Sequence, residues 1–181
     1  MQKLFLTFFY SGCAKKAPGT FGTLAALIPA FFILKYLGIT TLFLLSILIF
    51  IASIRVIDDY ERKTGIHDDK HIVIDEVAGV FLACAIAASG ANSLLNFFMA
   101  FVFFRIFDIT KPSIIGKIDK KTKGGLGVML DDMLAGLFAG LLSAVIYGFL
   151  LKFDLVFWDK DLINLFLRHR HLDLLIIHMR L

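Results

Sequence analysis

The sequence predicts an all-α membrane protein, a small polytopic helical bundle with about four to five apolar helices and a polar site on its cytoplasmic face. Hydrophobic residues make up 59% of the 181 residues, charged residues make up 19%, and the mean hydropathy is +0.83. Soluble domains are typically about 45–50% apolar and about 25% charged. One soluble core of this size could not hide so much apolar surface. The composition also excludes disordered, collagen-like and nucleic-acid-binding tails, so we expect no nucleic-acid partner.

Five apolar runs define the expected helices. They cover residues 21–37, 39–57, 77–88, 94–104 and 133–151. The first, second and last approach the ~20 residues that cross the hydrocarbon of a bilayer. The two middle runs are shorter and are separated by a turn cluster at 89–93. They predict either a helical hairpin whose arms extend into polar flanks or a partly re-entrant pair.

Residues 1–152 are expected to form one membrane-embedded domain, followed by a tail at 153–181. The stretch before Cys13 is too short for a convincing signal peptide, so we keep it in the mature protein. We expect this tail to form either an interfacial amphipathic helix with Trp158 in the aromatic belt or an irregular terminus. Gly136 and Gly140 suit close helix packing, and small lipid-facing residues would give the same pattern.

The net charge of +4 indicates topology first, because Lys and Arg collect in cytoplasmic loops. If the middle runs cross twice, the N-terminus, segment 55–76 and segment 105–132 share one side. Their basic residues are Lys3, Lys15, Lys16, Arg55, Arg62, Lys63, Lys70, Arg105, Lys111, Lys117, Lys120, Lys121 and Lys123. The opposite short loops hold only Lys35. The first side is therefore expected to face the cytoplasm, and the same charge is compatible with an anionic substrate.

Carboxylates lie directly beside the apolar runs. Asp75 and Glu76 precede one run, Asp131 and Asp132 precede another, and Asp108 ends the second arm of the hairpin. Asp and Glu favour the first turn of a helix, which explains one pair better than it explains two pairs and Asp108. Charges near hydrocarbon are costly unless they are paired, hydrated or metal-bound. An oxygen-rich site points to Mg²⁺ rather than Zn²⁺, with a remaining carboxylate orienting or deprotonating a water.

Two stretches are candidates for phosphate binding. Lys16, Gly19, Thr20 and Thr23 belong to a basic, glycine-containing segment before the first run. Backbone amides at such a helix start can hold an anion, although lysines there also serve topology.

The second stretch contains Arg105, Asp108 and Lys111. Arg105 and Asp108 share a helix face, and Pro112 leaves Lys111 at the helix end. Arg is the preferred bidentate partner of phosphate, and an ordinary Arg–Asp pair is the alternative.

A glycine run precedes the second acidic pair. Gly124, Gly125 and Gly127 form either a loop that lets the backbone approach a head group or a plain flexible loop.

Three segments resemble the phosphatidylglycerophosphatase A family. They are AKKAPGTFGTLAA, IVIDEVAGVF and FFRIFDITKPSIIGKIDKKTKGGLGVMLDDMLAG, and the resemblance covers about residues 11–148 in order. It implies a Mg²⁺-dependent lipid phosphatase of the bacterial inner membrane. This family hydrolyses phosphatidylglycerophosphate, a phospholipid, to phosphatidylglycerol and inorganic phosphate, which supplies phosphatidylglycerol and cardiolipin synthesis.

The family's motif residues fall on defined positions of this chain. They are Pro18, Gly19, Thr20, Gly22 and Thr23; Asp75, Glu76 and Gly79; Phe104, Arg105, Asp108, Lys111 and Pro112; and Gly124, Gly125, Gly127, Met129, Asp131, Asp132, Ala135 and Gly136. Two departures are Ile74, where the family often has Trp, and Ser113, where it often has a second proline.

The combined hypothesis is a Mg²⁺ site that Asp75, Glu76, Asp131 and Asp132 build at the cytoplasmic surface, with Asp108 nearby. Arg105, Lys111 and segment 15–23 would bind the phosphate, and a carboxylate-oriented water would attack in line. No Cys-x5-Arg loop or Asp-x-Asp-x-Thr motif is present, which argues against two other phosphatase classes.

Two alternatives are a small divalent-cation transporter that uses the same carboxylates and a non-catalytic membrane scaffold. A transporter predicts acidic residues at mid-span, whereas here they cluster at span ends. The oligomeric state, the division of roles among the carboxylates and a phosphoenzyme intermediate stay open at this point.

Overall fold

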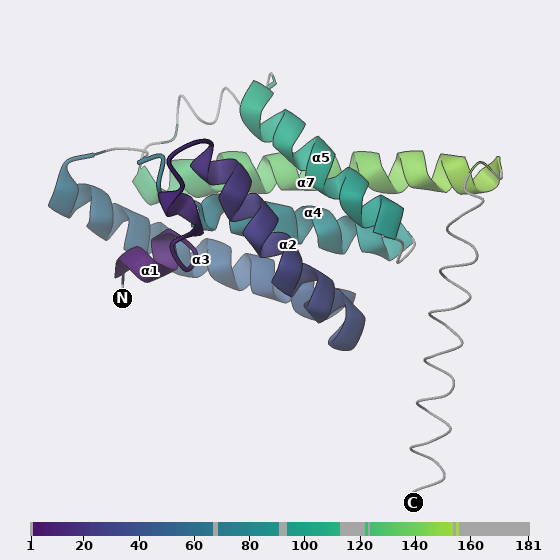
Figure 1. Ribbon diagram of the computed structural model, residues 1–181, viewed down its shortest axis with the longest axis horizontal. Helices are drawn as coiled ribbons and strands as arrows, with labels where there is room; N and C mark the ends of the chain where they lie inside the picture. Colours follow the sequence, from purple (N-terminus) through teal and green to yellow (C-terminus); the bar gives the residue numbers. More distant parts are fainter. Residues whose placement is uncertain are drawn as a thin grey trace, which may run out of the picture.

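The computed structural model describes residues 2–66, 69–90, 94–112, 122, 124–153 and 155, and this part of the chain is helical with no strand. The elements are α1 (Gln2–Leu6), the 3-10 helix η1 (Ser11–Cys13), α2 (Pro18–Tyr36), α3 (Ile39–Thr64), α4 (Ile74–Gly90), α5 (Leu94–Thr110) and α7 (Gly124–Lys152). The prediction of an all-α bundle is confirmed. Figure 1 shows the long helices lying side by side.

Glycines in the left-handed region end two of the helices. Gly38 follows α2 with φ 90°, and its N–H donates to the carbonyl of Ile33 at 2.9 Å. Gly65 follows α3 with φ 70°, and its N–H donates to the carbonyl of Glu61 at 2.8 Å. Such bonds satisfy the last carbonyls of a helix, and glycine takes this conformation without a Cβ clash. The chain can therefore reverse direction in short connections.

Helix α4 is the centre of the bundle. In Figure 1 it runs between α7 and α3, with α2 and α5 crossing in front, and all four helices contact it. Side chains from Val77 to Ala88 are almost all buried. A helix that is apolar all round belongs in a protein interior or a membrane, and α4 is surrounded by its neighbours.

Small residues let α4 and α7 approach closely. A Cβ on Gly136 would lie 2.2 Å from the carbonyl oxygen of Gly79, and one on Gly140 would lie 2.8 Å from that of Ala83. Both distances are too short for a real side chain, so these glycines serve helix packing rather than a lipid-facing surface. The close approach also fixes how the acidic starts of α4 and α7 face each other.

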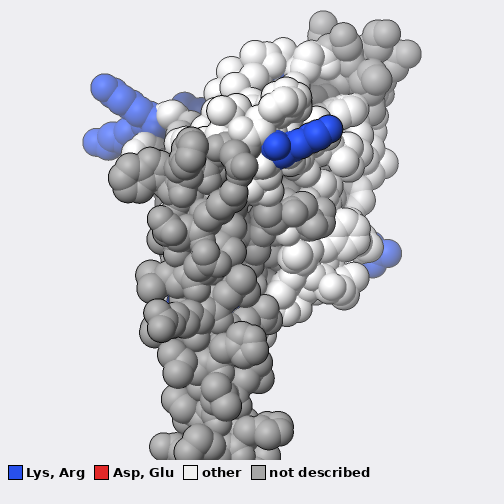
Figure 2. All heavy atoms as spheres, turned by 90° about the vertical axis from the view of Figure 1, so that its right-hand side faces the viewer, with Lys and Arg blue, Asp and Glu red and all other residues white. Residues whose placement is uncertain are grey.

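Three of the described helices, α2, α3 and α7, are long and apolar enough to cross a membrane by length and composition. Their outer faces carry exposed apolar side chains such as Leu48 (61% exposed) and Val145 (68%). Helices α4 and α5 have 17 residues each, slightly short of a full span. Figure 2 faces the end where α7 finishes, and the described atoms there are mostly uncharged, with a few Lys and Arg and no visible carboxylate.

Several predicted boundaries change. Helix α3 continues to Thr64 rather than residue 57, and α7 begins at Gly124 rather than residue 133. Helices α4 and α5 extend into their polar flanks, as the hairpin alternative required. The predicted tail, including Trp158, lies outside the described residues except for Phe153 and Leu155.

Candidate active site

A cleft of about 410 Å³ lies at the end of the bundle where α2, α4 and α7 begin and α5 ends. Five carboxylates line it, from three different helices. They are Asp75 and Glu76 in the first turn of α4, Asp108 in the last turn of α5, and Asp131 and Asp132 about two turns into α7. All five predicted catalytic residues therefore share one cleft.

Three of these carboxylates form a compact group. Asp75, Glu76 and Asp132 each offer an oxygen atom, and the three oxygens lie within 4.8 Å of one another. Asp75 is 8% exposed and Asp132 is 4% exposed. Oxygen Oδ1 of Asp75 and Oε2 of Glu76 are buried without a hydrogen-bond partner. Buried polar atoms are normally hydrogen-bonded, and clustered acidic groups away from water need a compensating charge.

Asp131 lies outside that group. Its Oδ2 accepts a bond from Nζ of Lys111 at 2.6 Å, and its Oδ1 accepts from the backbone N–H of Asp132 at 3.0 Å. The sequence proposed Asp131 as a fourth metal ligand. In the structure it is ion-paired with Lys111, and the metal role of Asp131 stays a prediction.

Arg105 connects the acidic group to the start of α2. Its guanidinium is ion-paired with Asp108, and Nη1 lies 4.0 Å from Oε1 of Glu76. Nη1 and Nη2 also donate to the hydroxyls of Thr23 and Thr20, both at 3.3 Å. Its Nε is buried without a hydrogen-bond partner. The predicted Arg105–Asp108 pair exists, and it lies beside the carboxylates rather than apart from them.

The start of α2 contributes backbone to the cleft through Gly19 and Thr20. A Cβ on Gly19 would lie 2.2 Å from Oε1 of Glu76, so a larger residue at this position would displace the Glu76 carboxylate. Thr23 does not line the cleft. Its buried hydroxyl donates to the carbonyl of Gly19 at 2.7 Å and accepts from Arg105, which makes it a positioning residue.

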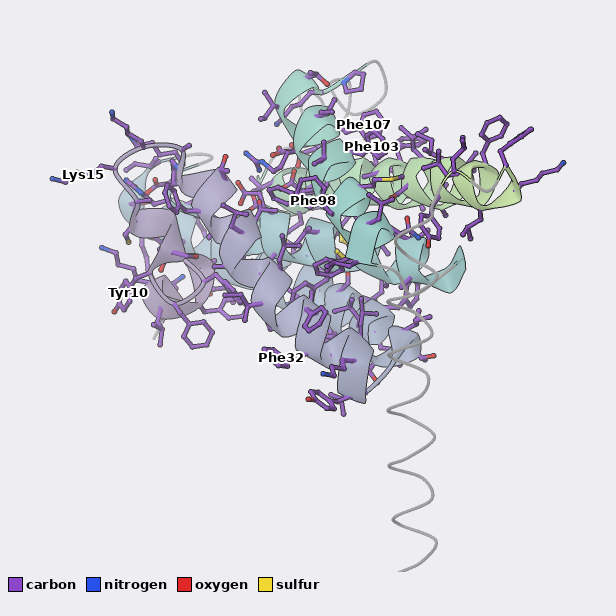
Figure 3. All side chains as sticks on the ribbon, turned by 45° about the vertical axis from the view of Figure 1, so that its right-hand side comes forward. Tyr10, Lys15, Phe32, Phe98, Phe103 and Phe107 are labelled. Atoms are coloured by element: carbon purple, nitrogen blue, oxygen red, sulfur yellow. The ribbon has the colours of Figure 1, made fainter. Side chains whose placement is uncertain are left out.

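Lys16 does not reach the cleft. It is exposed in the segment before α2, and the lining begins at Ala17. In Figure 3 its neighbour Lys15 projects outward from the same end of the molecule, as does Tyr10. Sequence analysis left two roles open for these lysines, phosphate binding and membrane topology. Their exposed position at the charged end of the bundle favours the role in topology.

Lys111 occupies an unusual backbone position. It follows α5 with φ 41°, and its N–H donates to the carbonyl of Phe107 at 2.9 Å. A non-glycine residue in this region is uncommon and is often found at functional sites. Pro112 comes next and ends the helix, as the sequence predicted. The helix end thus directs Lys111 across the cleft toward α7.

The predicted glycine loop is wrong. Gly124, Gly125 and Gly127 form the first turn of α7. Oδ1 of Asp58 accepts a bond from the N–H of Gly125 at 2.6 Å, and a Cβ on Gly125 would lie 2.2 Å from the carbonyl oxygen of Ile54. Glycine is therefore required here for contact with α3. Of these three glycines, only Gly127 lines the cleft. Glycine has a low helix propensity, but the contact with α3 and the cap from Asp58 favour a helix here.

Sequence patterns missed two residues. Asp58 caps the start of α7 from α3, and no local motif indicates such a long-range contact. Lys70 lines the cleft from the segment between α3 and α4. The sequence counted it only as one of many cytoplasmic lysines, although its place five residues before Asp75 was a signal.

Comparisons with known proteins identify the family of the chain. The family model described as Phosphatidylglycerophosphatase A matches residues 4–147. The Haemophilus influenzae protein named Phosphatidylglycerophosphatase A is 37% identical over 131 residues, covering 72% of this chain and 79% of the relative. The Escherichia coli protein of the same name is 34% identical over 135 residues, covering 74% and 77%.

A Bacteroides thetaiotaomicron relative, provisionally named a phosphatidylinositol-3-phosphatase, is 36% identical over 143 residues, covering 77% of this chain and 89% of the relative. No solved structure matches the chain. The family match includes α2, α4, α5, the part of α7 up to residue 147, and all five carboxylates of the cleft. On this evidence the chain belongs to the phosphatidylglycerophosphatase A family.

Proposed function

We propose that this protein is a Mg²⁺-dependent lipid phosphatase that hydrolyses phosphatidylglycerophosphate to phosphatidylglycerol and inorganic phosphate. One observation carries the proposal beyond family membership. The carboxylates of Asp75, Glu76 and Asp132 meet within 4.8 Å, and Arg105 lies directly beside them. A cation site next to a guanidinium suits a phosphate monoester. The guanidinium can donate hydrogen bonds to the phosphoryl oxygens, and the cation can neutralise their negative charge.

Asp75, Glu76 and Asp132 would hold the metal. Carboxylate oxygens suit the hard Mg²⁺ ion, and the unpartnered Oδ1 of Asp75 and Oε2 of Glu76 fit a ligand role. When bound, Mg²⁺ supplies charge neutralisation for the phosphoryl oxygens. The described residues of the cleft offer no His or Cys, so its donor set does not favour zinc.

Arg105 and the start of α2 would bind the phosphate group. The guanidinium is fixed by Thr20, Thr23 and Asp108, so it loses little freedom when the substrate arrives. Its Nε lacks a protein partner and can donate to a phosphate oxygen. Backbone amides at the first turn of α2 lack helical acceptors and favour an anion. Lys111 completes the cationic set from the opposite edge.

A carboxylate that does not hold the metal would accept the proton of the attacking water, and Asp108 and Asp131 are the two candidates. The water oxygen bonds to phosphorus while the bond between phosphorus and the glycerol oxygen breaks. The departing oxygen takes up a proton to give the free hydroxyl of phosphatidylglycerol. Both candidates are ion-paired with cleft cations, which keeps them oriented.

The cleft would face the cytoplasm in a bacterial inner membrane. Basic residues gather at its end of the bundle, where α2 begins and α3 ends, while Lys35 and Lys152 lie at the other end. The chain offers its own probe of this orientation, because Cys13 is exposed and Cys84 is buried. A membrane-impermeant maleimide should label Cys13 in inverted vesicles and not in intact spheroplasts. The opposite pattern would reverse the proposed topology.

The test of function is a phosphate-release assay on the purified full chain in detergent. Phosphatidylglycerophosphate, phosphatidylinositol 3-phosphate and phosphatidic acid should be compared with and without Mg²⁺. We expect Mg²⁺-dependent release with phosphatidylglycerophosphate as the preferred substrate. The B. thetaiotaomicron relative makes phosphatidylinositol 3-phosphate the second candidate. No release from any lipid, together with metal flux in liposomes, would favour the transporter alternative.

A further inference from the structure

The segment between α3 and α4 brings a third cation to the cleft. Lys70 lines it together with Arg105 and Lys111, but it comes from a different part of the fold. Arg105 and Lys111 lie at the end of α5, whereas Lys70 precedes α4 and is exposed at the mouth. The family motifs do not include this lysine, and the proposed mechanism does not use it.

The backbone that carries Lys70 is held on both sides. Oδ2 of Asp69 accepts a bond from the hydroxyl of Tyr60 at 2.6 Å, and its Oδ1 accepts from the N–H of His71 at 3.0 Å. Nδ1 of His71 lies 2.8 Å from the carbonyl oxygen of Gly12, which ties the segment to the N-terminal region. Lys70 therefore stands on a fixed support and is not part of a free loop.

Asp69 accepts the hydrogen bonds of this support as an ionised carboxylate. Burial raises the pKa of Asp69, but the hydrogen bonds from Tyr60 and His71, with the nearby charges of His71 and Lys70, leave the pKa below its ordinary value. Both of its oxygens accept bonds from the support rather than from Lys70.

The three cleft cations differ in their partners. Arg105 is ion-paired with Asp108, and Lys111 is ion-paired with Asp131 at 2.6 Å. Lys70 forms no hydrogen bond or ion pair with any residue that the structure describes. A cleft cation that makes no hydrogen bond or ion pair with the described residues is available to an anionic ligand, while the paired cations are already positioned for the reacting phosphate.

We propose that Lys70 binds the phosphodiester of the lipid head group and so selects substrates that carry a second phosphate. The inference rests on the proposed function. The substrate has a terminal monoester, which reacts, and a diester, which joins the head group to the diacylglycerol. A cleft of about 410 Å³ lies in the size range of small-molecule sites and accommodates more than one phosphate group. Phosphatidic acid has no second phosphate for Lys70 to bind.

Turnover of two lipids in mixed micelles tests this selection. For Lys70→Ala we expect the KM for phosphatidylglycerophosphate to rise about tenfold, as for one lost charge-assisted hydrogen bond. Its kcat should stay within about twofold, because Lys70 does not touch the reacting atoms. The KM for phosphatidic acid should not change. Lys70→Arg should restore the KM, and Lys63→Ala, an exposed lysine outside the cleft, should have no effect.

Two results would overturn the role of Lys70. Equal KM changes for both lipids would indicate a general attraction to the anionic surface, and an unchanged KM in Lys70→Ala would remove Lys70 from the site.

A binding measurement separates this inference from the proposed function. Glycerophosphoglycerol is the water-soluble head group that carries the diester alone, so a phosphatase does not consume it. Ligand-observed NMR on the full chain in detergent should detect its binding to the wild type, to Lys70→Arg and to Lys63→Ala, but not to Lys70→Ala. Equal binding to all four proteins, or to none, contradicts the role of Lys70. A wild type that does not hydrolyse phosphatidylglycerophosphate contradicts the proposed function, whatever the NMR result.

Discussion

At the end of the bundle away from the cleft, the side-chain amide of Asn96 on α5 donates to the carbonyl of Ala87 at 2.7 Å and accepts from the hydroxyl of Ser143 at 2.9 Å. At the cleft end, Oδ1 of Asp75 and Oε2 of Glu76 are equally buried, and neither has a hydrogen-bond partner. Both ends place polar groups between the same helices. One set is satisfied by the protein, and the other is not.

This difference separates structural from functional polarity in a membrane bundle. The Asn96 and Ser143 pair joins α5 to α7, as interhelical hydrogen bonds commonly do. The carboxylates at the other end repel one another and are costly to bury, so folding alone gives no reason to keep them. At Asp75 and Glu76, a ligand from outside the chain would satisfy these buried atoms, and under the proposed function that ligand is a cation with the substrate phosphate.

The largest effect should come from Asp132→Asn. The amide keeps the shape but removes a charge from the three-carboxylate group, so metal binding and phosphate hydrolysis should both weaken. We expect kcat to fall at least about 100-fold, since even outer partners of a metal site cost roughly 10–100-fold. Phosphate release from phosphatidylglycerophosphate at saturating Mg²⁺ measures it.

Stability provides the control for this substitution. Fewer like charges remain in the cleft, so the melting temperature in EDTA should equal or exceed that of the wild type. Asp59→Asn is the matched variant, because Asp59 is half exposed and pairs with Arg62 on the surface. It should leave kcat unchanged. Near-normal turnover of Asp132→Asn would remove Asp132 from the metal site.

Arg105→Lys should have the next largest effect. Lysine keeps the charge but loses the planar guanidinium, whose two terminal nitrogens reach the hydroxyls of Thr20 and Thr23. The start of α2 would then lose its connection to the acidic group. We expect kcat/KM to drop about 30- to 100-fold, consistent with roughly 2–3 kcal/mol of lost transition-state binding.

Arg62→Lys is the matched exchange at an exposed ion pair, with a side chain 76% exposed. Surface pairs contribute little, so its kcat/KM should stay at the wild-type value. If Arg105→Lys behaved in the same way, charge alone would hold the phosphate, and the bridge to α2 would have no catalytic role.

Sequence patterns went far toward this cleft, because three of its five carboxylates, those of Asp75, Glu76 and Asp108, lie in the terminal turns of helices. The Asp75–Glu76 pair, the Arg105 and Asp108 spacing and the stop at Pro112 all follow from helix geometry, and the structure brings them together. Helix ends on one side of a bundle must lie near one another, so topology alone already predicted a shared polar face.

The errors have one cause, which is contact between residues far apart in the chain. Glycine propensity predicted a loop before Asp131, but the carboxylate of Asp58 caps a helix there, and Gly125 packs on the backbone of α3. The ion pair between Lys111 and Asp131 was also not predicted. Neither contact leaves a local pattern, because Asp58 and Gly125 are 67 positions apart and Lys111 and Asp131 are 20 positions apart.

Removing Mg²⁺ should lower the stability of the protein through the carboxylates of the cleft. A ligand that binds only the folded state stabilises it by RT ln(1 + [L]/Kd), about 2.7 kcal/mol at 100 times Kd. Wild-type protein in detergent should therefore melt at a higher temperature in Mg²⁺ than in EDTA, and Asp132→Asn should lose this difference. A Mg²⁺ shift that survives in Asp132→Asn would locate the bound ion elsewhere.

The smallest effect should come from the opposite end. Asn96→Ala removes the two side-chain bonds to the carbonyl of Ala87 and the hydroxyl of Ser143 and keeps the bond from Ser143 to the backbone carbonyl of residue 96, so the unfolding free energy in detergent should fall by about 1–2 kcal/mol. The Mg²⁺-dependent melting shift and kcat/KM should both be retained at temperatures where the variant is folded, because the side chain of Asn96 bonds to Ala87 and Ser143, and neither residue lines the cleft. Loss of activity in folded Asn96→Ala would couple the two ends and contradict the division between a satisfied structural end and an unsatisfied reactive one.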